Sequence, residues 1–78
     1  MSKVRNYRDR IAELEYQLRG PRIMSHKAYS AISREIADLD GRCAYLEGRP
    51  RETNPNDPST VQFGYWDDAW CQEYEANS

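Results

Sequence analysis

The side chains that could do chemistry in this sequence are few and widely separated. There is one histidine, His26, and the two cysteines, Cys43 and Cys71, do not form a C-x-x-C pair. Zinc usually requires four nitrogen or sulfur ligands at close spacing. The sequence also lacks the glycine-rich phosphate loops and the G-x-S-x-G and H-E-x-x-H motifs. We therefore predict a protein that is not an enzyme, with no catalytic residue, no metal ligand and no cofactor.

A basic cluster occupies the stretch RGPRIMSHK between two amphipathic segments. Arg19 and Arg22 suit the C-terminal end of the first segment, where the helix dipole favours cations. His26 and Lys27 fall in the first turn of the second segment, which disfavours them. Solvated surface charge is one interpretation of the pair. The other is a contact for an acidic partner, phosphate or a nucleotide, because free backbone N–H groups at a helix start also attract anions.

Aromatic and acidic residues dominate the C-terminal segment. Phe63, Trp66, Trp70 and Tyr74 follow one another at spacings of three, four and four, which predicts one face of a helix over about residues 65–75. A short strand over 61–63 is an alternative for its first residues. Trp and Tyr dominate interface hot spots, so this helix is our main candidate for partner binding. Its candidate residues are Tyr65, Trp66, Asp67, Asp68, Trp70 and Tyr74.

The same aromatic face could instead form the core of this small protein. In that arrangement the helix packs across the rest of the chain, and Asp67 and Asp68 lie in its first turns, where the dipole favours acids. The surface available to it consists of the residues that lie off the main hydrophobic pattern, namely Ala12, Tyr16, Ala37, Ala44 and Tyr45. The sequence leaves core and interface as competing interpretations of Trp66 and Trp70.

Two long helices must position these residues. Apolar residues recur at alternating spacings of three and four in two series, Val4–Tyr7–Ile11–Leu14–Leu18 and Tyr29–Ile32–Ile36–Leu39–Cys43–Leu46. This is the a/d pattern of a coiled-coil seam. It predicts helices over about 3–19 and 25–47, with Ser25 as a helix cap. Because the two seams match in length and a short Gly-Pro turn joins them, we predict an antiparallel hairpin.

Two residues of the second helix need separate comment. Gly41 lies inside it on the side away from the seam, where glycine costs about 1 kcal/mol relative to alanine. Cys43 lies at a seam position, so we interpret it as a small buried hydrophobe. A bridge to Cys71 would require the C-terminal helix to return to the seam, and we expect both thiols to remain free.

The chain as a whole is predicted to be all-α. Residues 1–48 form the hairpin, residues 49–59 form a connector with three prolines and no apolar side chain, and residues 60–78 form the aromatic–acidic segment. Only 38% of the residues are hydrophobic and 31% are charged, so a small core must be supplemented. Dimerisation of two hairpins into a helical bundle would be one way to supplement it.

Charge and hydropathy narrow the kinds of partner that this protein is expected to bind. Residues 1–51 carry eleven Lys or Arg and seven Asp or Glu, whereas residues 52–78 carry six acids and no Lys or Arg. A pI near 5.3 and the absence of a clean basic stripe make nucleic acid a less favoured partner. There is no apolar run long enough to span a membrane and no signal-peptide pattern. We expect a cytoplasmic protein that does not associate with membranes.

The function favoured by these patterns is protein–protein interaction. We expect a small inhibitor or modulator that occupies a site on a larger protein or complex, in the style of phage and mobile-element products that act on host or anti-defence machinery. The first alternative is a structural homo-oligomer, a homodimer in its simplest form. The second is a nucleotide or nucleic-acid binder that uses the basic cluster at the hairpin turn.

Overall fold

The computed structural model describes residues 2–20 and 23–77 of the 78-residue chain. Three α-helices follow one another, α1 (Lys3–Arg19), α2 (His26–Leu46) and α3 (Val61–Ala76), and one 3₁₀ turn, η1 (Arg51–Thr53), lies before α3. No strand occurs within these described ranges. The predicted all-α class, with a helical hairpin followed by a C-terminal helix, is confirmed.

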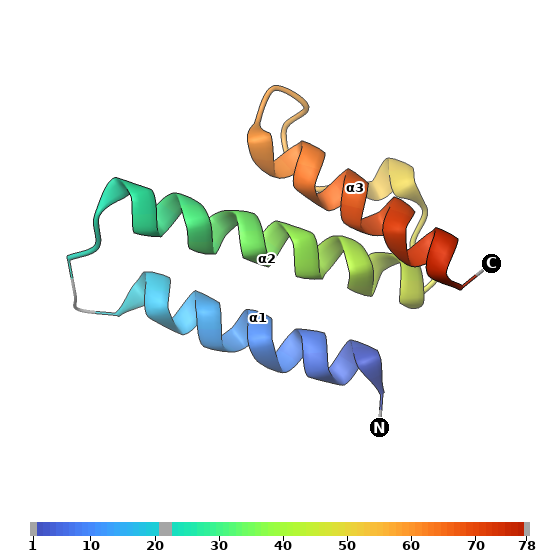
Figure 1. The fold of residues 1–78 in the computed structure, drawn as a ribbon, viewed down its shortest axis with the longest axis horizontal. Helices are drawn as coiled ribbons and strands as arrows, with labels where there is room; N and C mark the ends of the chain where they lie inside the picture. Colours follow the sequence, from blue (N-terminus) through green and yellow to red (C-terminus); the bar gives the residue numbers. More distant parts are fainter. Residues whose placement is uncertain (1, 21–22, 78) are drawn as a thin grey trace.

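Helices α1 and α2 run side by side in opposite directions (Figure 1). Ile11 and Leu14 are the buried residues of α1, and Cys43 reaches the carbonyl oxygen of Val4 at 4.0 Å on the opposite helix. Ion pairs border the seam, with Arg10 beside Glu35 and Arg8 beside Asp40. The hydroxyl of Ser25 accepts a hydrogen bond from the N–H of Ala28, so the predicted cap of α2 forms.

Helix α3 packs against α2 on the side opposite α1, so the three helices form one flat layer (Figure 1). The molecule measures 41 × 33 × 17 Å along its principal axes. Gly41 explains how closely α3 approaches, because a Cβ atom at this position would lie 2.2 Å from the carbonyl oxygen of Trp66. Ala37, Ala44 and Ala69 are also buried in this contact region. The surface of α2 that receives α3 is therefore built from small residues.

The C-terminal helix begins four residues earlier than the sequence predicted. The hydroxyl of Thr60 accepts a hydrogen bond from the N–H of Phe63, and this cap starts α3 at Val61. The alternative of a strand over 61–63 is therefore wrong. As a consequence Asp67 and Asp68 lie in the second turn of α3, away from the helix start where the prediction placed them.

The connector turns back beside the helices. Gly48 adopts a left-handed φ of 77°, which ends α2. The side-chain amide of Asn54 then donates a hydrogen bond to the carbonyl oxygen of Phe63, and Arg51 forms a bidentate pair with Asp67. These contacts hold the connector against α3.

Candidate functional site

Trp66 is a core residue. Its side chain is 0% exposed and packs with Ala37 and Ala44 of α2. Its indole N–H donates a 2.8 Å hydrogen bond to Oδ2 of Asp40. Of the two interpretations of Trp66 that the sequence left open, the structure places the residue inside the protein, where it cannot meet a partner directly.

Trp70 and Tyr74 form a half-buried aromatic cluster with Tyr45. The Trp70 indole N–H donates a 2.9 Å hydrogen bond to the carbonyl oxygen of Arg49. The Tyr45 ring meets the Trp70 ring edge-on, with centroids 5.4 Å apart, and Trp70 stacks on Tyr74 at 5.8 Å. The indole is thus engaged on its edge and on one face. Its main contacts are internal, and they attach the C-terminal half of α3 to α2 and the connector.

The expected packing surface of α3 is corrected in one respect. Ala37, Ala44 and Tyr45 of α2 contact the helix, as expected. Ala12 and Tyr16 of α1 remain exposed. The reason is geometric, because α3 lies on the far side of α2, and α2 separates most of it from α1.

The outer side of α3 carries the remaining candidates of the aromatic–acidic segment. The guanidinium of Arg51 holds Asp67, and this hydrogen bond lowers the pKa of the Asp67 carboxyl. Tyr65 is partly exposed, with the guanidinium of Arg34 5.9 Å from its ring centroid. Asp68 is exposed. These side chains form a surface of mixed charge.

Sequence reasoning missed Glu73, which joins all three helices. The residue is 3% exposed. The hydroxyl of Tyr7 donates to its carboxylate at 3.0 Å, Arg42 donates at 3.3 Å, and the ammonium of Lys3 lies 3.9 Å away. Burial alone would raise the pKa of Glu73, but the hydrogen bonds from Tyr7 and Arg42 outweigh it and leave the pKa lowered. Its position seven residues after Trp66, on the same helix face, was the available signal.

At the hairpin tip, the C-terminal end of α1 and the N-terminal end of α2 project beyond α3 (Figure 1). Ile23 is 102% exposed and Tyr16 is 72% exposed. His26 and Lys27, in the first turn of α2, are also exposed, and within the described residues no acceptor or carboxylate contacts either side chain. We call these four residues the tip surface. Of the two other basic residues predicted here, Arg19 is exposed and Arg22 lies outside the described residues.

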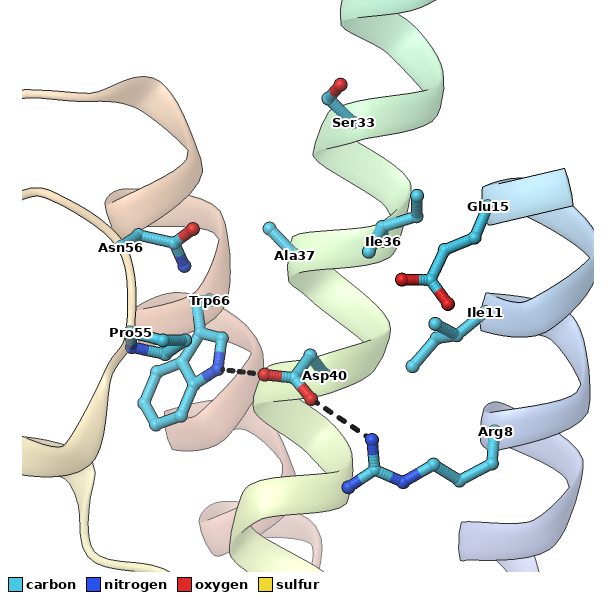
Figure 2. Close-up of a pocket in the computed structure, with 10 residues that line it drawn as sticks. All are labelled: Arg8, Ile11, Glu15, Ser33, Ile36, Ala37, Asp40, Pro55, Asn56 and Trp66. Carbon is cyan, nitrogen blue, oxygen red and sulfur yellow. Dashed lines mark hydrogen bonds and ion pairs between the residues drawn. The ribbon is translucent and has the colours of Figure 1, made fainter. Parts of the chain in front are cut away.

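A groove runs along one broad face of the hairpin. Its deeper part is a cavity of about 340 Å³ whose floor is formed by Ile11 of α1 and by Ile36 and Ala37 of α2 (Figure 2). Glu15 borders this part and also borders a second hollow of about 290 Å³ nearer the tip. The second hollow is lined by Leu18, Arg19 and Tyr29 together with Glu15.

Charged side chains line the deeper part of the groove. Asp40 accepts hydrogen bonds from Arg8 at 3.4 Å and from Trp66, so its carboxylate is already engaged (Figure 2). Pro55 and Asn56 of the connector form the wall opposite α1. By contrast, Glu15 and Arg19 contact no charged partner within the described part of the chain. Unpaired charge in the groove is therefore concentrated on the α1 side.

Among the described residues, the histidine and the two cysteines lie apart from one another. Cys43 and Cys71 are unbridged, and burial raises the pKa of the Cys43 thiol. His26 lies at the tip, at the opposite end of α2 from Cys43. No group of three His, Cys, Asp or Glu side chains within residues 2–20 and 23–77 is placed to hold a metal ion.

Two further findings bear on the class of protein. None of the helices in the described part of the chain combines the length and the apolarity needed to cross a membrane. Comparison of the chain with protein-family models, with curated proteins and with solved structures gave no match. The function must therefore be argued from the surfaces described above.

Proposed function

We propose that this protein is a non-catalytic interaction module that modulates a larger protein by occupying a site on it with its hairpin tip. The observation that supports this most directly is the contrast between the two candidate regions. Trp66, the centre of the aromatic–acidic segment, is 0% exposed, whereas Ile23 at the tip is 102% exposed. Ile23 is the most exposed large apolar side chain of the described residues, which supports the tip as the region that enters a partner.

The composition of the tip surface indicates what it would bind. Ile23 and Tyr16 offer apolar area, and His26 and Lys27 offer positive charge that no described carboxylate neutralises. Interfaces draw most of their binding energy from a few apolar and aromatic anchors, while rim charges guide the encounter and select the partner. A complementary surface would be an apolar hollow with an acidic rim.

The proposal is tested by placing a photo-crosslinking amino acid at the tip. A benzophenone side chain at position 23 should capture a larger protein in the cells that make this one. Position 61 is the matched control, because Val61 is also an exposed apolar residue but lies at the start of α3. Capture at 61 and not at 23, or capture at neither position, would contradict the proposal.

Substitutions then separate the apolar contact from the charge. With the captured protein in hand, Ile23→Ser should weaken binding roughly tenfold or more because it removes the apolar anchor. Lys27→Glu should slow association and reduce its dependence on salt, because it replaces a charge that attracts an acidic rim. If Ile23→Ser left binding unchanged while Lys27→Glu abolished it, the tip would be a simple anion site, as a nucleotide binder requires, and the proposal would fail.

A further inference from the structure

Helix α1 is attached to α2 less firmly than α3 is. Two residues of α1, Ile11 and Leu14, are buried. On the other side of α2, Trp66 and Ala69 of α3 are 0% exposed, and both indole N–H groups of α3 donate hydrogen bonds to groups outside their own helix. Because buried apolar area supplies most of the free energy of helix docking, α1 should detach more readily than α3.

The charged contacts of α1 add little to its attachment, because they lie at the surface. In their ion pairs the side chains of Lys3, Arg8 and Arg10 are 61%, 44% and 43% exposed, and exposed pairs contribute little to stability. A hydrogen bond from Tyr7 to Glu73 is partly buried. A helix of 17 residues is marginal in water without packing, so α1 would unfold on release while α2 and α3 stayed paired.

The surface beneath α1 is apolar along the α2 seam and acidic beside it. Cys43 is 0% exposed there, with its sulfur 4.0 Å from the carbonyl oxygen of Val4 on α1. In each ion pair between α1 and the rest of the described chain, the base lies on α1. The acids of these pairs are Glu35, Asp40, Glu47 and Glu73. Two bases, Arg42 and Arg49, also contact three of these acids, which leaves more acid than base beside the seam.

We propose that α1 is a displaceable cover and that its release opens the α2 seam to a basic amphipathic helix of a partner protein. Helix α1 itself shows the chemistry of that occupant, because it places apolar residues at spacings of three and four and Arg or Lys beside them. An apolar groove with acidic edges accepts such a helix. The seam is distinct from the tip surface, so this interface goes beyond the proposed function.

The first test uses Cys43 as a reporter of the release of α1, in a full-length chain that carries Cys71→Ser. An aromatic disulfide reagent forms a mixed disulfide with the Cys43 thiolate and releases a coloured thiolate. The reaction rate should rise with urea less steeply than global unfolding followed by tryptophan fluorescence, because release of α1 exposes less surface. If the two urea dependences and the two free energies were equal, Cys43 would be reached only by global unfolding and the proposal would be overturned.

Two variants on opposite sides of α2 sharpen this test. Leu14→Ala weakens the contact of α1 and should speed the reaction of Cys43 in the absence of urea by roughly tenfold or more. Trp70→Ala weakens the contact of α3 and should leave the rate unchanged, because α1 opens without α3. Rates that rose in both variants in proportion to their lost global stability would refute the displaceable cover.

The second test supplies the occupant as a fluorescent synthetic peptide with the sequence of residues 2–20. Fluorescence anisotropy should show that it binds the full-length Leu14→Ala chain roughly tenfold or more tightly than the unsubstituted chain, because the open state is more populated. The control is the same peptide with Arg8→Glu and Arg10→Glu, which brings like charges against Asp40 and Glu35 and should bind at least about tenfold more weakly.

Two outcomes would overturn the docking surface. One is equal binding of the two peptides, and the other is no binding of either peptide to a Leu14→Ala chain whose Cys43 reacts freely. Crosslinking at position 23 reports on the tip and does not depend on the seam, so either proposal can fail without the other.

Discussion

At the scale of single residues, the contact between Gly41 and the backbone of Trp66 limits which residue position 41 of α2 can carry. A methyl group at position 41 would lie 2.2 Å from the Trp66 carbonyl oxygen and 3.0 Å from its carbonyl carbon. Backbone atoms cannot move aside as the end of a flexible side chain can. Glycine lowers the stability of the isolated helix relative to alanine, but the close approach of α3 requires it at this position.

We expect Gly41→Ala to destabilise the protein by about 1–3 kcal/mol, the usual cost of overpacking, even though alanine is the better helix former. Gly64 in α3 provides the matched control, because a Cβ atom there would meet nothing within 4 Å. Gly64→Ala should stabilise by roughly 0.5–1 kcal/mol. Urea unfolding of both variants measures the difference, and a stabilising Gly41→Ala would show that α3 does not dock as described.

Glu73 should make stability depend on pH. Its folded-state pKa is lowered, so the unfolded chain binds the proton more tightly than the folded one does. The stabilisation is therefore present above the unfolded pKa, near 4.5, and is lost as the pH falls through the folded pKa.

The measurement is the free energy of unfolding of the native protein and of Glu73→Gln between neutral and acid pH. At neutral pH the variant should be less stable by about 1–3 kcal/mol, because charge-assisted hydrogen bonds are lost. The gap should narrow as the pH falls below the unfolded pKa of Glu73. A gap that stayed constant across this range would mean that the ionised carboxylate contributes nothing.

At the scale of elements, α2 is the centre of the molecule and α3 is attached to it mainly by aromatic side chains. Trp66 is buried against small residues, and its indole is held by Asp40. Trp70 is only half-buried and lies between Tyr45 and Tyr74. The two tryptophans are one helical turn apart in the sequence. We expect the docking of α3 on α2 to depend more on Trp66 than on Trp70.

We expect Trp66→Ala to cost about 3–5 kcal/mol, because it leaves a large cavity and removes the indole donor from Asp40. Trp70→Ala should cost less, since solvent can reach the space that it vacates. Each variant retains one tryptophan, so urea unfolding followed by fluorescence and by circular dichroism compares them directly. Equal losses of unfolding free energy in the two variants would contradict the difference in burial between Trp66 and Trp70.

At the scale of the whole molecule, three helices in one layer give an extended body. The Cα radius of gyration is 12.9 Å, whereas a domain of this length typically has about 11.5 Å. In solution, X-ray scattering from the protein extrapolated to low concentration should give a value at or slightly above 12.9 Å. A value near that of a rounded domain would show that α3 folds over the hairpin and that the flat arrangement is wrong.

Local periodicity allowed much of the fold to be predicted. The spacing of Val4, Tyr7 and Ile11 fixes one face of α1, and the matching seam of α2 fixes the antiparallel register, because helix faces depend only on nearby residues. The helix cap at Ser25 could likewise be predicted from nearby residues. Thr60 was a signal of the same kind that was overlooked, so the start of α3 was misplaced.

The helical hairpin and the existence of a third helix were thus determined by the sequence itself, whereas residues 21–22 of the predicted turn lie outside the described residues. Which side of α2 receives α3 was decided only in the tertiary structure, by the fit of Gly41 against the Trp66 backbone and by the convergence of Tyr7 and Arg42 on Glu73. These contacts join residues far apart in the chain, and no local spacing encodes them. Because that choice buries Trp66, it also leaves Ile23 at the tip as the most exposed large apolar side chain of the described residues.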